Sequence, residues 1–392
     1  MSEWKEYKLG ETCDIITGFS FKGEEYEPSG NLKVVRGENV TRGTLRWDNE
    51  KHWNKSTDKL EKYFLEEGDI VIGMDGSRIG QNKAIIRKEE LPLILAQRVA
   101  KIKAKNGFSQ VFLWYNIFSN SFKNYVESIH TGTSIPHISQ GQIADFEILA
   151  PSYEEQKAIA SVLSSLDNKI DLLLRQNQTL EAMAETLFRQ WFIEEAEDSW
   201  EKGKLGDYIQ TTSGGTPSRA NVNFYENGNI RWVKSKELNG TFIFDTEEKI
   251  TDEAVKKSSA KLIPANSVLI AMYGATIGQF GILAIPATCN QAICALIPNE
   301  QYPYSFLYIF IKFNKEYIES LAMGSAQQNI SQVIIKDINI LTPNDKIVEF
   351  HKTVEPSFLK IKANISKINT LTQLRDTLLP KLMSGQVRVS EK

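Results

Sequence analysis

The chain has 392 residues and a formal net charge of −3, and 41% of its residues are hydrophobic and 24% charged. This length predicts two or three globular domains, and no apolar run approaches the roughly 20 residues that span a bilayer. Three cysteines are too few for a disulfide framework, and the first residues lack the apolar core of a signal peptide. These features predict a cytoplasmic protein and exclude a membrane-spanning helix.

The first block, residues 1–152, has a mixed α and β pattern. Turn-bounded apolar runs such as Ile70 to Ile72 predict strands. An aromatic-rich stretch from Val111 to Ile129 predicts a helix. Its aromatic side chains are more typical of a buried core than of platforms for base stacking.

Residues 153–197 predict one long helix that packs against another helix. Apolar residues recur in alternating steps of four and three, which is the heptad pattern of a coiled coil. Ser152 and Glu155 have capping-box spacing at its start. The polar Asn177 either fixes the register of the paired helices or marks a kink that faces solvent. The predicted contact residues are Ile159, Leu163, Leu166, Ile170, Leu173, Asn177, Leu180 and Leu187.

The second block, residues 198–344, repeats the first. Trp200 to Gly206 matches Trp4 to Gly10 at an offset of 196 residues, half of the chain length. The predicted strand at Val268 to Ile270 and the aromatic-rich helix at Ser305 to Leu321 follow in the same order as their counterparts. A period this long indicates a duplicated domain and not a solenoid repeat.

The C-terminal segment, residues 345–392, predicts a second long helix. Pro356 predicts an interruption near its start, and Pro380 and Gly385 predict its end. The segment carries a net charge of +4, whereas residues 153–201 carry −7, so the two helices are expected to pair. The fold class is therefore α+β, with two similar mixed blocks separated by paired helices in a pseudo-two-fold internal repeat. The predicted contact residues of this helix are Ile361, Ile365, Ile368, Leu371, Leu374 and Leu378.

Catalytic and cofactor motifs are missing from the sequence. There is no GxxxxGK[ST] phosphate loop, no Asn- or Asp-Pro-Pro-aromatic tetrapeptide and no glycine-rich nucleotide loop after a first strand. Cys289 and Cys294 have no histidine nearby, so no metal site is expected. We expect a binding protein and not an enzyme. The alternatives are a complete single-chain DNA methyltransferase or nuclease, and a coiled-coil adaptor that binds proteins only.

Polar loops beside glycines recur at equivalent places in both blocks. Arg, Lys, Asn and Gln can contact base edges, whereas Ser, Thr and backbone amides can bind phosphate. Each loop alone is most simply a polar surface turn, but recurrence with different residues fits two scaffolds that recognise two sequences. The candidate DNA contacts of the first block are Thr17, Ser20, Lys22, Arg36, Asn39, Ser77, Arg78, Gln97, Arg98, Thr133, Ser134 and His137. Those of the second block are Ser213, Thr216, Ser218, Arg219, Lys234, Ser235, Lys236, Tyr273, Thr276, Gln291, Gln327, Gln328 and Asn329.

Several of these segments together resemble the specificity subunit of Type I restriction–modification systems over essentially the whole chain. The most specific segments are Asn177 to Phe192, Leu374 to Val389, Gly214 to Arg219 and Gly68 to Gly80. The resemblance implies two target-recognition domains, residues 1–152 and 198–344, that alternate with two helices, residues 153–197 and 345–392.

The resemblance also implies how such a chain works. Each recognition domain would bind one half of a bipartite site in double-stranded DNA. The helices would form an antiparallel coiled coil, set the spacing of the half-sites and dock two methyltransferase subunits. No cofactor would bind this chain, because S-adenosylmethionine belongs to the methyltransferase, and ATP and magnesium belong to the motor-nuclease subunits of the full complex. Since both blocks are neutral overall, the partners are expected to supply much of the phosphate contact.

Overall fold

The computed structural model of the chain describes residues 4–129, 136–322 and 329–389. Its internal contacts divide the chain into two compact units. Unit 1 comprises residues 1–169 and 371–392, and unit 2 comprises residues 170–370. Each unit therefore joins one globular block to a part of both long helices. The four successive segments expected from the repeat are a different division of the chain, and their boundaries stay a prediction.

Unit 1 is built on three small sheets of five, three and two strands. The five-stranded sheet has the order β2 (Cys13–Thr17), β9 (Val99–Ala104), β6 (Ile70–Gly73), β7 (Lys83–Ile85) and β4 (Arg42–Gly43). The three-stranded sheet has the order β3 (Lys33–Val35), β8 (Leu93–Leu95) and β5 (Phe64–Leu65), and β1 (Lys5–Lys8) pairs with β10 (Glu147–Ala150). The helices are α1 (Leu9–Thr12), α2 (Gln110–Phe118), α3 (Asn120–Ile129) and α4 (Gln140–Ala144).

Unit 2 repeats this arrangement. Its five-stranded sheet has the order β12 (Gln210–Ser213), β19 (Ile293–Ile297), β16 (Val268–Ala271), β17 (Phe280–Leu283) and β14 (Phe242–Ile243). The second sheet has the order β15 (Lys249–Ile250), β13 (Ile230–Val233) and β18 (Thr288–Cys289), and β11 (Lys202–Lys204) pairs with β20 (Asn339–Leu341). The helices are α6 (Leu205–Tyr208), α7 (Asp252–Lys257), α8 (Tyr304–Phe313), α9 (Lys315–Ser320) and α10 (Gln332–Lys336).

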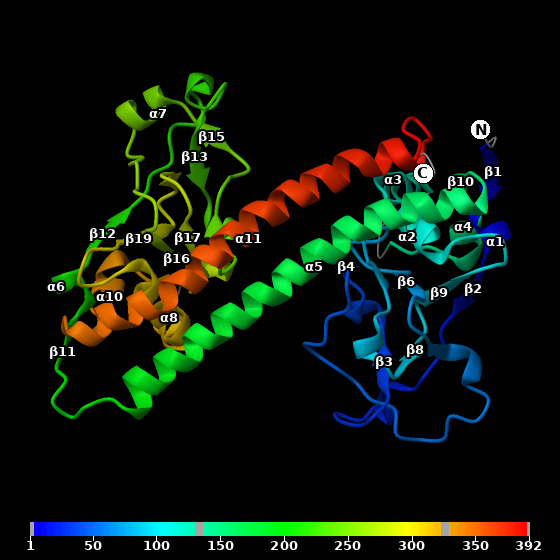
Figure 1. Ribbon diagram of the computed structural model, residues 1–392, viewed down its shortest axis with the longest axis horizontal. Coiled ribbons are helices and arrows are strands. Elements are labelled where there is room, and N and C mark those ends of the chain that lie inside the picture. Colours follow the sequence, from blue (N-terminus) through cyan, green and yellow to red (C-terminus); the bar gives the residue numbers. More distant parts are fainter. Residues whose placement is uncertain (1–3, 130–135, 323–328, 390–392) are drawn as a thin grey trace. The chain divides into compact units, whose positions relative to one another are not determined.

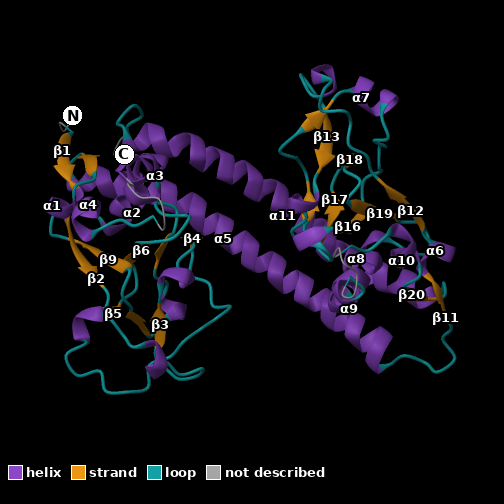
Figure 2. Cartoon of the chain, turned by 180° about the vertical axis from the view of Figure 1, so that it is seen from behind, coloured by secondary structure: helices purple, strands orange, loops and turns teal. Residues whose placement is uncertain are grey.

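The two five-stranded sheets also share their strand directions. In both, the first four strands are antiparallel neighbours and the last strand, β4 or β14, pairs in parallel. Figure 2 shows β16, β17 and β19 beside helix α8 in unit 2. The shared topology of the five-stranded sheets confirms the internal repeat and the α+β class, whereas the three-stranded sheets differ in their central strand, which is β8 in unit 1 and β13 in unit 2. The predicted strands at Ile70 to Ile72 and Val268 to Ile270 are confirmed as β6 and β16.

The two long helices are α5 (Tyr153–Arg189), which continues as a π-helical turn over Gln190–Glu194, and α11 (Asp345–Met383). Each contributes side chains to the core of each unit. In unit 1, Ile159 and Leu163 of α5 and Leu379 and Leu382 of α11 are buried with the sheet and α2. Figure 1 shows α2 beside the first part of α5.

Side-chain contacts show that α5 and α11 are antiparallel within each unit. In unit 1, Asp167 bonds Arg375 at 2.8 Å and Glu155 bonds Arg388 at 2.6 Å. In unit 2, Asn364 donates to Asn177 at 2.8 Å and to Gln176 at 2.9 Å, and Phe350 packs against Phe188. As the residue numbers decrease along α5, the numbers of the residues that they contact in the C-terminal segment increase. Asn177 therefore fits the first of its two interpretations, a polar residue that fixes the register of the paired helices, since the buried Asn364 contacts it.

The burial of the predicted contact residues follows this pairing, with one exception. Ile159, Leu163, Leu173 and Ile361 are buried, and nine others, Leu166, Ile170, Asn177, Leu180, Leu187, Ile365, Ile368, Leu371 and Leu378, are half-buried. Leu374 is different, because 44% of it is exposed. The neighbouring Arg375 takes the facing position through its ion pair with Asp167.

Two expectations about the boundaries of α11, at Pro356 and Pro380, were wrong, whereas the expected end at Gly385 is confirmed. Pro356 does not interrupt α11. The backbone hydrogen bond that proline cannot donate would go to the carbonyl of Lys352, which is exposed. The buried side chains of Val354 and Phe358 hold the helix on both sides of the proline. Pro380 likewise lies inside the last turn, and the helix ends at Met383 before Gly385, which has φ of +72°.

The aromatic-rich helices are each two helices. The first breaks at Ser119, whose hydroxyl donates to the Asn116 carbonyl at 2.6 Å and accepts from the Phe122 amide. The second breaks at Asn314. Most of the aromatic side chains lie in the core as expected, but Tyr317 is 52% exposed.

Among the described helices, none combines the length and apolar character that crossing a membrane requires.

Candidate nucleic-acid interface

Most predicted DNA contacts of unit 1 gather at one edge of the five-stranded sheet. At this edge β2 ends, β9 begins and β6 ends, because β9 is antiparallel to both neighbours. Backbone bonds join the loops that leave it: Gln97 donates to the Phe19 carbonyl at 2.7 Å, and Met74 donates to the Arg98 carbonyl at 2.9 Å. Gly18 is required here, because a Cβ would clash with the Ala96 carbonyl.

The side chains at this edge of unit 1 form two polar pairs. Ser20 donates from its hydroxyl to the Gln97 amide oxygen at 2.8 Å. Arg98 donates to Asp75 at 2.9 Å, yet 64% of the Arg98 side chain stays exposed. A β-bridge places His137 opposite Asp75. Thr17 is half-buried at the end of β2, whereas Lys22, Ser77 and Arg78 are exposed on the same loops.

Arg36 and Asn39 lie in the turn after β3. Arg36 pairs with Glu38 and donates to the Asn49 carbonyl at 2.6 Å. Asn39 is only 1% exposed, and its amide accepts from the Arg36 backbone and donates to the Arg46 carbonyl. Its side chain therefore holds the turn and is not presented to a ligand, which departs from the prediction.

Unit 2 has the equivalent edge, where β12 ends, β19 begins and β16 ends. Thr216 donates to the Gln291 amide oxygen, as Ser20 does to Gln97. Tyr273 is 41% exposed, and a β-bridge places Asn329 opposite it. Ser213 donates to Gln332 at 3.0 Å, Ser218 is exposed and Thr276 is half-buried.

The predicted basic contacts of unit 2 are held by carboxylates. Lys234 bonds both Glu247 at 3.0 Å and Glu248 at 2.8 Å, Lys236 bonds Glu247 at 2.7 Å, and Arg219 bonds Glu248 at 2.6 Å. Hydrogen bonds from Arg219 and then Lys234 lower the pKa of Glu248 to about 2. This carboxylate cluster (Glu247 and Glu248) offsets two of the three positive charges that the sequence indicated. The half-buried Ser235 starts the turn that carries these lysines.

Sequence reasoning missed the acidic members of both edges. Asp75, Glu247 and Glu248 were not considered, because only side chains that suit phosphate and base contacts were selected. The spacing between Lys234 and the two glutamates shows no periodic signal, since the pairing depends on how β13 and β15 meet. Thr133, Ser134, Gln327 and Gln328 lie outside the described residues.

Lys83 on β7 is a buried charge that the sequence did not indicate. Its ammonium donates to the Ile117 carbonyl at the end of α2 at 2.5 Å and faces the Phe122 ring at 5.2 Å. Burial, together with the positive charges of Arg42 and Lys123, lowers the pKa of Lys83 to about 7.

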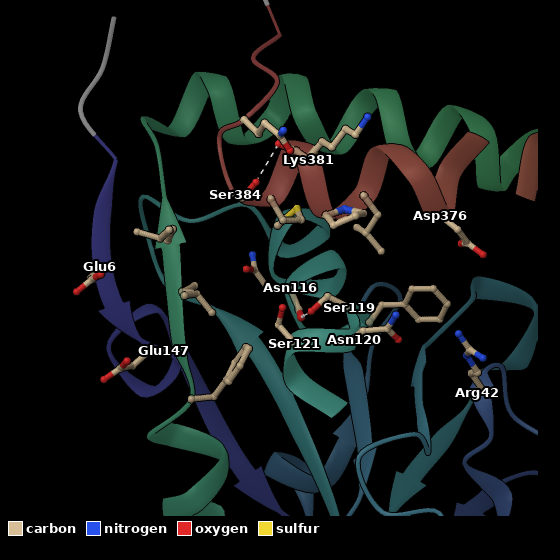
Figure 3. A pocket seen from close by; sticks show the side chains of 18 residues that line it. Glu6, Arg42, Asn116, Ser119, Asn120, Ser121, Glu147, Asp376, Lys381 and Ser384 are labelled. Atoms are coloured by element: carbon tan, nitrogen blue, oxygen red, sulfur yellow. Dashed lines mark hydrogen bonds between the residues drawn. The ribbon is translucent and has the colours of Figure 1, made fainter. Parts of the chain in front are cut away.

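A second feature that both units share is a surface pocket beside the two-stranded sheet. In unit 1 a pocket of about 700 Å³ lies between the corner of α2 and α3, strand β10 and the end of α11. Figure 3 shows Asn116, Ser119, Asn120 and Ser121 grouped at that corner, below Lys381 near the end of α11 and Ser384 directly after it. The wall of the pocket includes Glu6, which pairs with Leu149 across the two-stranded sheet.

Unit 2 has a pocket of about 360 Å³ at the equivalent place. It lies between α8, α9, strand β20 and the end of α5, and its wall includes Lys202, which pairs with Leu341 across the two-stranded sheet. The unit 2 pocket is more aromatic, with Phe188, Phe192 and Phe313 in its lining. The repeat therefore duplicates a concave surface as well as the polar edge.

Comparison with known proteins adds to this geometry. The profile of the Type I restriction modification DNA specificity domain matches residues 1–182 and again residues 197–371. The Type I restriction enzyme MjaIX specificity subunit of Methanocaldococcus jannaschii is 28% identical over 324 residues, which cover 76% of this chain and 74% of that protein. The HindI specificity subunit of Haemophilus influenzae is 25% identical over 99% of this chain and 100% of that protein.

The fold is also found among solved structures. The S subunit of a Type I restriction-modification system from M. genitalium superimposes with a TM-score of 0.64 at 18% identity, over 97% of this chain and 96% of that one. This similarity therefore covers nearly the whole length of both chains.

Proposed function

The chain belongs to the Type I restriction modification DNA specificity family, and from this premise we propose that each unit recognises one half of a bipartite site in double-stranded DNA. The observation that carries the proposal is the pair of equivalent polar edges. Each lies at the ends of the same three strands, each presents exposed donors and acceptors, and the residues differ between them. Such a pair suits two different half-sites.

The chain is proposed to act as a non-catalytic subunit. Methyl transfer and cleavage would come from partners: two methyltransferase subunits that bind S-adenosylmethionine, and motor-nuclease subunits that use ATP and magnesium. The duplicated pocket supports two copies of one partner, because equivalent surfaces on a repeated scaffold bind equivalent surfaces. The paired helices α5 and α11 would serve as further docking surface and would set the distance between the half-sites.

The charge of the proposed DNA-binding edges supports a division of DNA binding between this chain and its partners. In unit 2 the carboxylate cluster offsets Arg219, Lys234 and Lys236, and in unit 1 Asp75 offsets Arg98. Non-specific affinity for DNA comes mainly from phosphate neutralisation. The chain would thus supply sequence selection, while the partners supply much of the attraction to the backbone.

The test is to express the chain with its methyltransferase subunit in a host without adenine methylation and to sequence the modified genome. The proposal predicts methylation at one bipartite sequence with a fixed spacer, and no methyl transfer by the chain alone. Methyl transfer by the chain alone would show a complete enzyme. An assembled complex that selects no sequence would indicate an adaptor that binds proteins only.

A further inference from the structure

The two polar edges share one side-chain pair while their other residues differ. In unit 1 the hydroxyl of Ser20 donates to the amide oxygen of Gln97 at 2.8 Å. In unit 2 the hydroxyl of Thr216 donates to the amide oxygen of Gln291. All four side chains are exposed. We call these the hydroxyl–glutamine pairs.

The hydroxyl–glutamine pairs occupy the same positions in the fold. Each hydroxyl lies three residues after the first strand of its sheet, since β2 ends at Thr17 and β12 ends at Ser213. Each glutamine lies two residues before the next strand, since β9 starts at Val99 and β19 starts at Ile293. The pair is therefore a property of the duplicated scaffold.

The loops do not need this side-chain bond to stay together. In unit 1 the Phe19 amide donates to the Leu95 carbonyl at 3.0 Å and the Gln97 amide donates to the Phe19 carbonyl at 2.7 Å. In unit 2 the Gly215 amide donates to the Cys289 carbonyl at 2.9 Å. These backbone bonds hold the loops after β2 and β12 against the turns that precede β9 and β19. The exposed side-chain bond then serves to orient the glutamine amide.

An oriented glutamine amide matches one base edge in the major groove. The carbonyl oxygen of a glutamine accepts two hydrogen bonds, so Oε1 can accept from the hydroxyl and still accept from a second donor. Its Nε2 group donates beside that oxygen. Adenine presents the N6 amino donor next to the N7 acceptor, and glutamine can bond both at once. Guanine and thymine present acceptors there, and cytosine offers only its N4 donor.

The neighbours of the two pairs differ in chemistry. Beside Gln97 stand Arg98 and Asp75, which form an ion pair of 2.9 Å. Beside Gln291 stand Ala292 and the exposed Tyr273. The shared pairs can therefore bind the same base in both half-sites, while the neighbouring residues make the rest of the half-sites different.

We propose that Gln97 and Gln291 are the specificity-determining residues for one adenine in each half-site, and that Ser20 and Thr216 position their amides. This proposal rests on the proposed function, because it concerns the same DNA edges. The adenine is bound at N6 and N7 while it remains stacked in the duplex.

The first test replaces each glutamine by methionine, which keeps the length of the side chain and removes both hydrogen-bonding groups. Modified sites are sequenced for the complex carrying Gln97→Met or Gln291→Met. Each variant is expected to lose discrimination by roughly 5- to 150-fold at one A·T position of one half-site, and the two variants to affect opposite halves. Gln301→Met is the control, since this exposed glutamine follows the other end of β19.

The second test asks whether the amide contacts N7. Each adenine of the recognised duplex is replaced in turn by 7-deazaadenine, and binding by the wild-type complex is measured. One position in each half is expected to lose affinity, and that loss should disappear in the matching methionine variant. Ser20→Ala should weaken discrimination at the same position as Gln97→Met, but less.

The outcomes separate this proposal from the proposed function. If the wild-type complex recognises a bipartite site but no 7-deazaadenine weakens its binding, the adenine contact is overturned and the proposed function stands. Equal losses in the wild type and the methionine variant would also overturn it, because the glutamine would then not be the group that meets N7. A wild-type complex without a defined site would refute the proposed function itself.

Discussion

At the scale of single residues, carboxylates decide how much positive charge the DNA edges expose. Arg98 is paired with Asp75 but stays largely exposed, whereas Lys234 is enclosed by Glu247 and Glu248. The basic residues were identifiable from the sequence by type. Their partners were not, because Glu248 reaches them through the pairing of strands and not through a local motif.

We predict that Glu248→Gln increases non-specific binding of DNA by the assembled complex. The carboxylate that holds Arg219 and Lys234 would be lost, so both cations could meet phosphates. Binding to unrelated duplex should strengthen several-fold, and the dependence of log affinity on log salt should steepen by about one. Glu226→Gln makes the same charge change at an exposed neighbouring site and should have a smaller effect. Equal effects of the two variants would mean that the cluster does not restrain the cations.

We predict a pH-dependent cost from the buried Lys83. Its pKa is about 7 in the folded chain against an ordinary value of 10.5. Between these values the unfolded chain binds a proton that the folded chain does not, so this group makes wild-type stability rise with pH. In urea unfolding, the free energy of unfolding of the wild type relative to that of Lys83→Met should therefore increase from pH 7 to 10. Lys88→Met, at an exposed position, should show no such trend. A constant difference for Lys83→Met would contradict the buried charge.

At the scale of elements, the long helices were predictable because their apolar pattern is periodic. Single residues within them were predicted wrongly where a contact of one side chain outweighs that pattern. Leu374 fits the period, yet Arg375 faces α5 because Asp167 offers it an ion pair. Pro356 is a strong local signal for a break, but burial of Val354 and Phe358 outweighs the single lost hydrogen bond. The break at Ser119 depends on a hydroxyl cap that has no periodic signature.

We predict that the buried amide contact between α5 and α11 is needed for stability. Asn364→Ala would leave the half-buried Asn177 oxygen and the exposed Gln176 oxygen without this donor, which should cost about 1 kcal/mol of unfolding free energy. Asn369→Ala, at an exposed position of the same helix, should cost much less. Chemical unfolding of both variants tests this. A double variant with Asn177→Ala should cost less than the sum of the two single changes.

The helices are also predicted to set the spacer between half-sites. Duplicating Ala184 to Leu187 would disturb the core of unit 2, because Ala184 is buried and Glu185 bonds Lys312. The insertion is better placed where the chain passes between units, with four residues after Lys169 and four after Thr370. Four helical residues add about 6 Å, which corresponds to one or two base pairs at roughly 3.4 Å each. Sequencing methylated sites should show a longer spacer with unchanged half-sites. An unchanged spacer in an active complex would leave the helices a docking surface alone.

At the scale of the whole molecule, the repeat is the property that the sequence showed most clearly. Matching segments such as Trp4 to Gly10 and Trp200 to Gly206 indicated two copies of one domain, and the equivalent strand orders of the two five-stranded sheets confirm it. The division into compact units was not predictable, because each core is completed by parts of both helices. In unit 2, Phe188 and Phe192 from α5 pack with Phe350 from α11.

The central claim is that each unit recognises its own half-site, and exchange of one unit tests it most directly. Residues 170–370 would be replaced by the corresponding unit of a relative with helices of equal length, so that the core of unit 2 stays intact. The measurement is the genome-wide methylation profile of the complex with each chain. The account predicts that one half of the recognised sequence changes to that of the relative while the other half and the spacer stay the same. A change in both halves, or in neither, would contradict it.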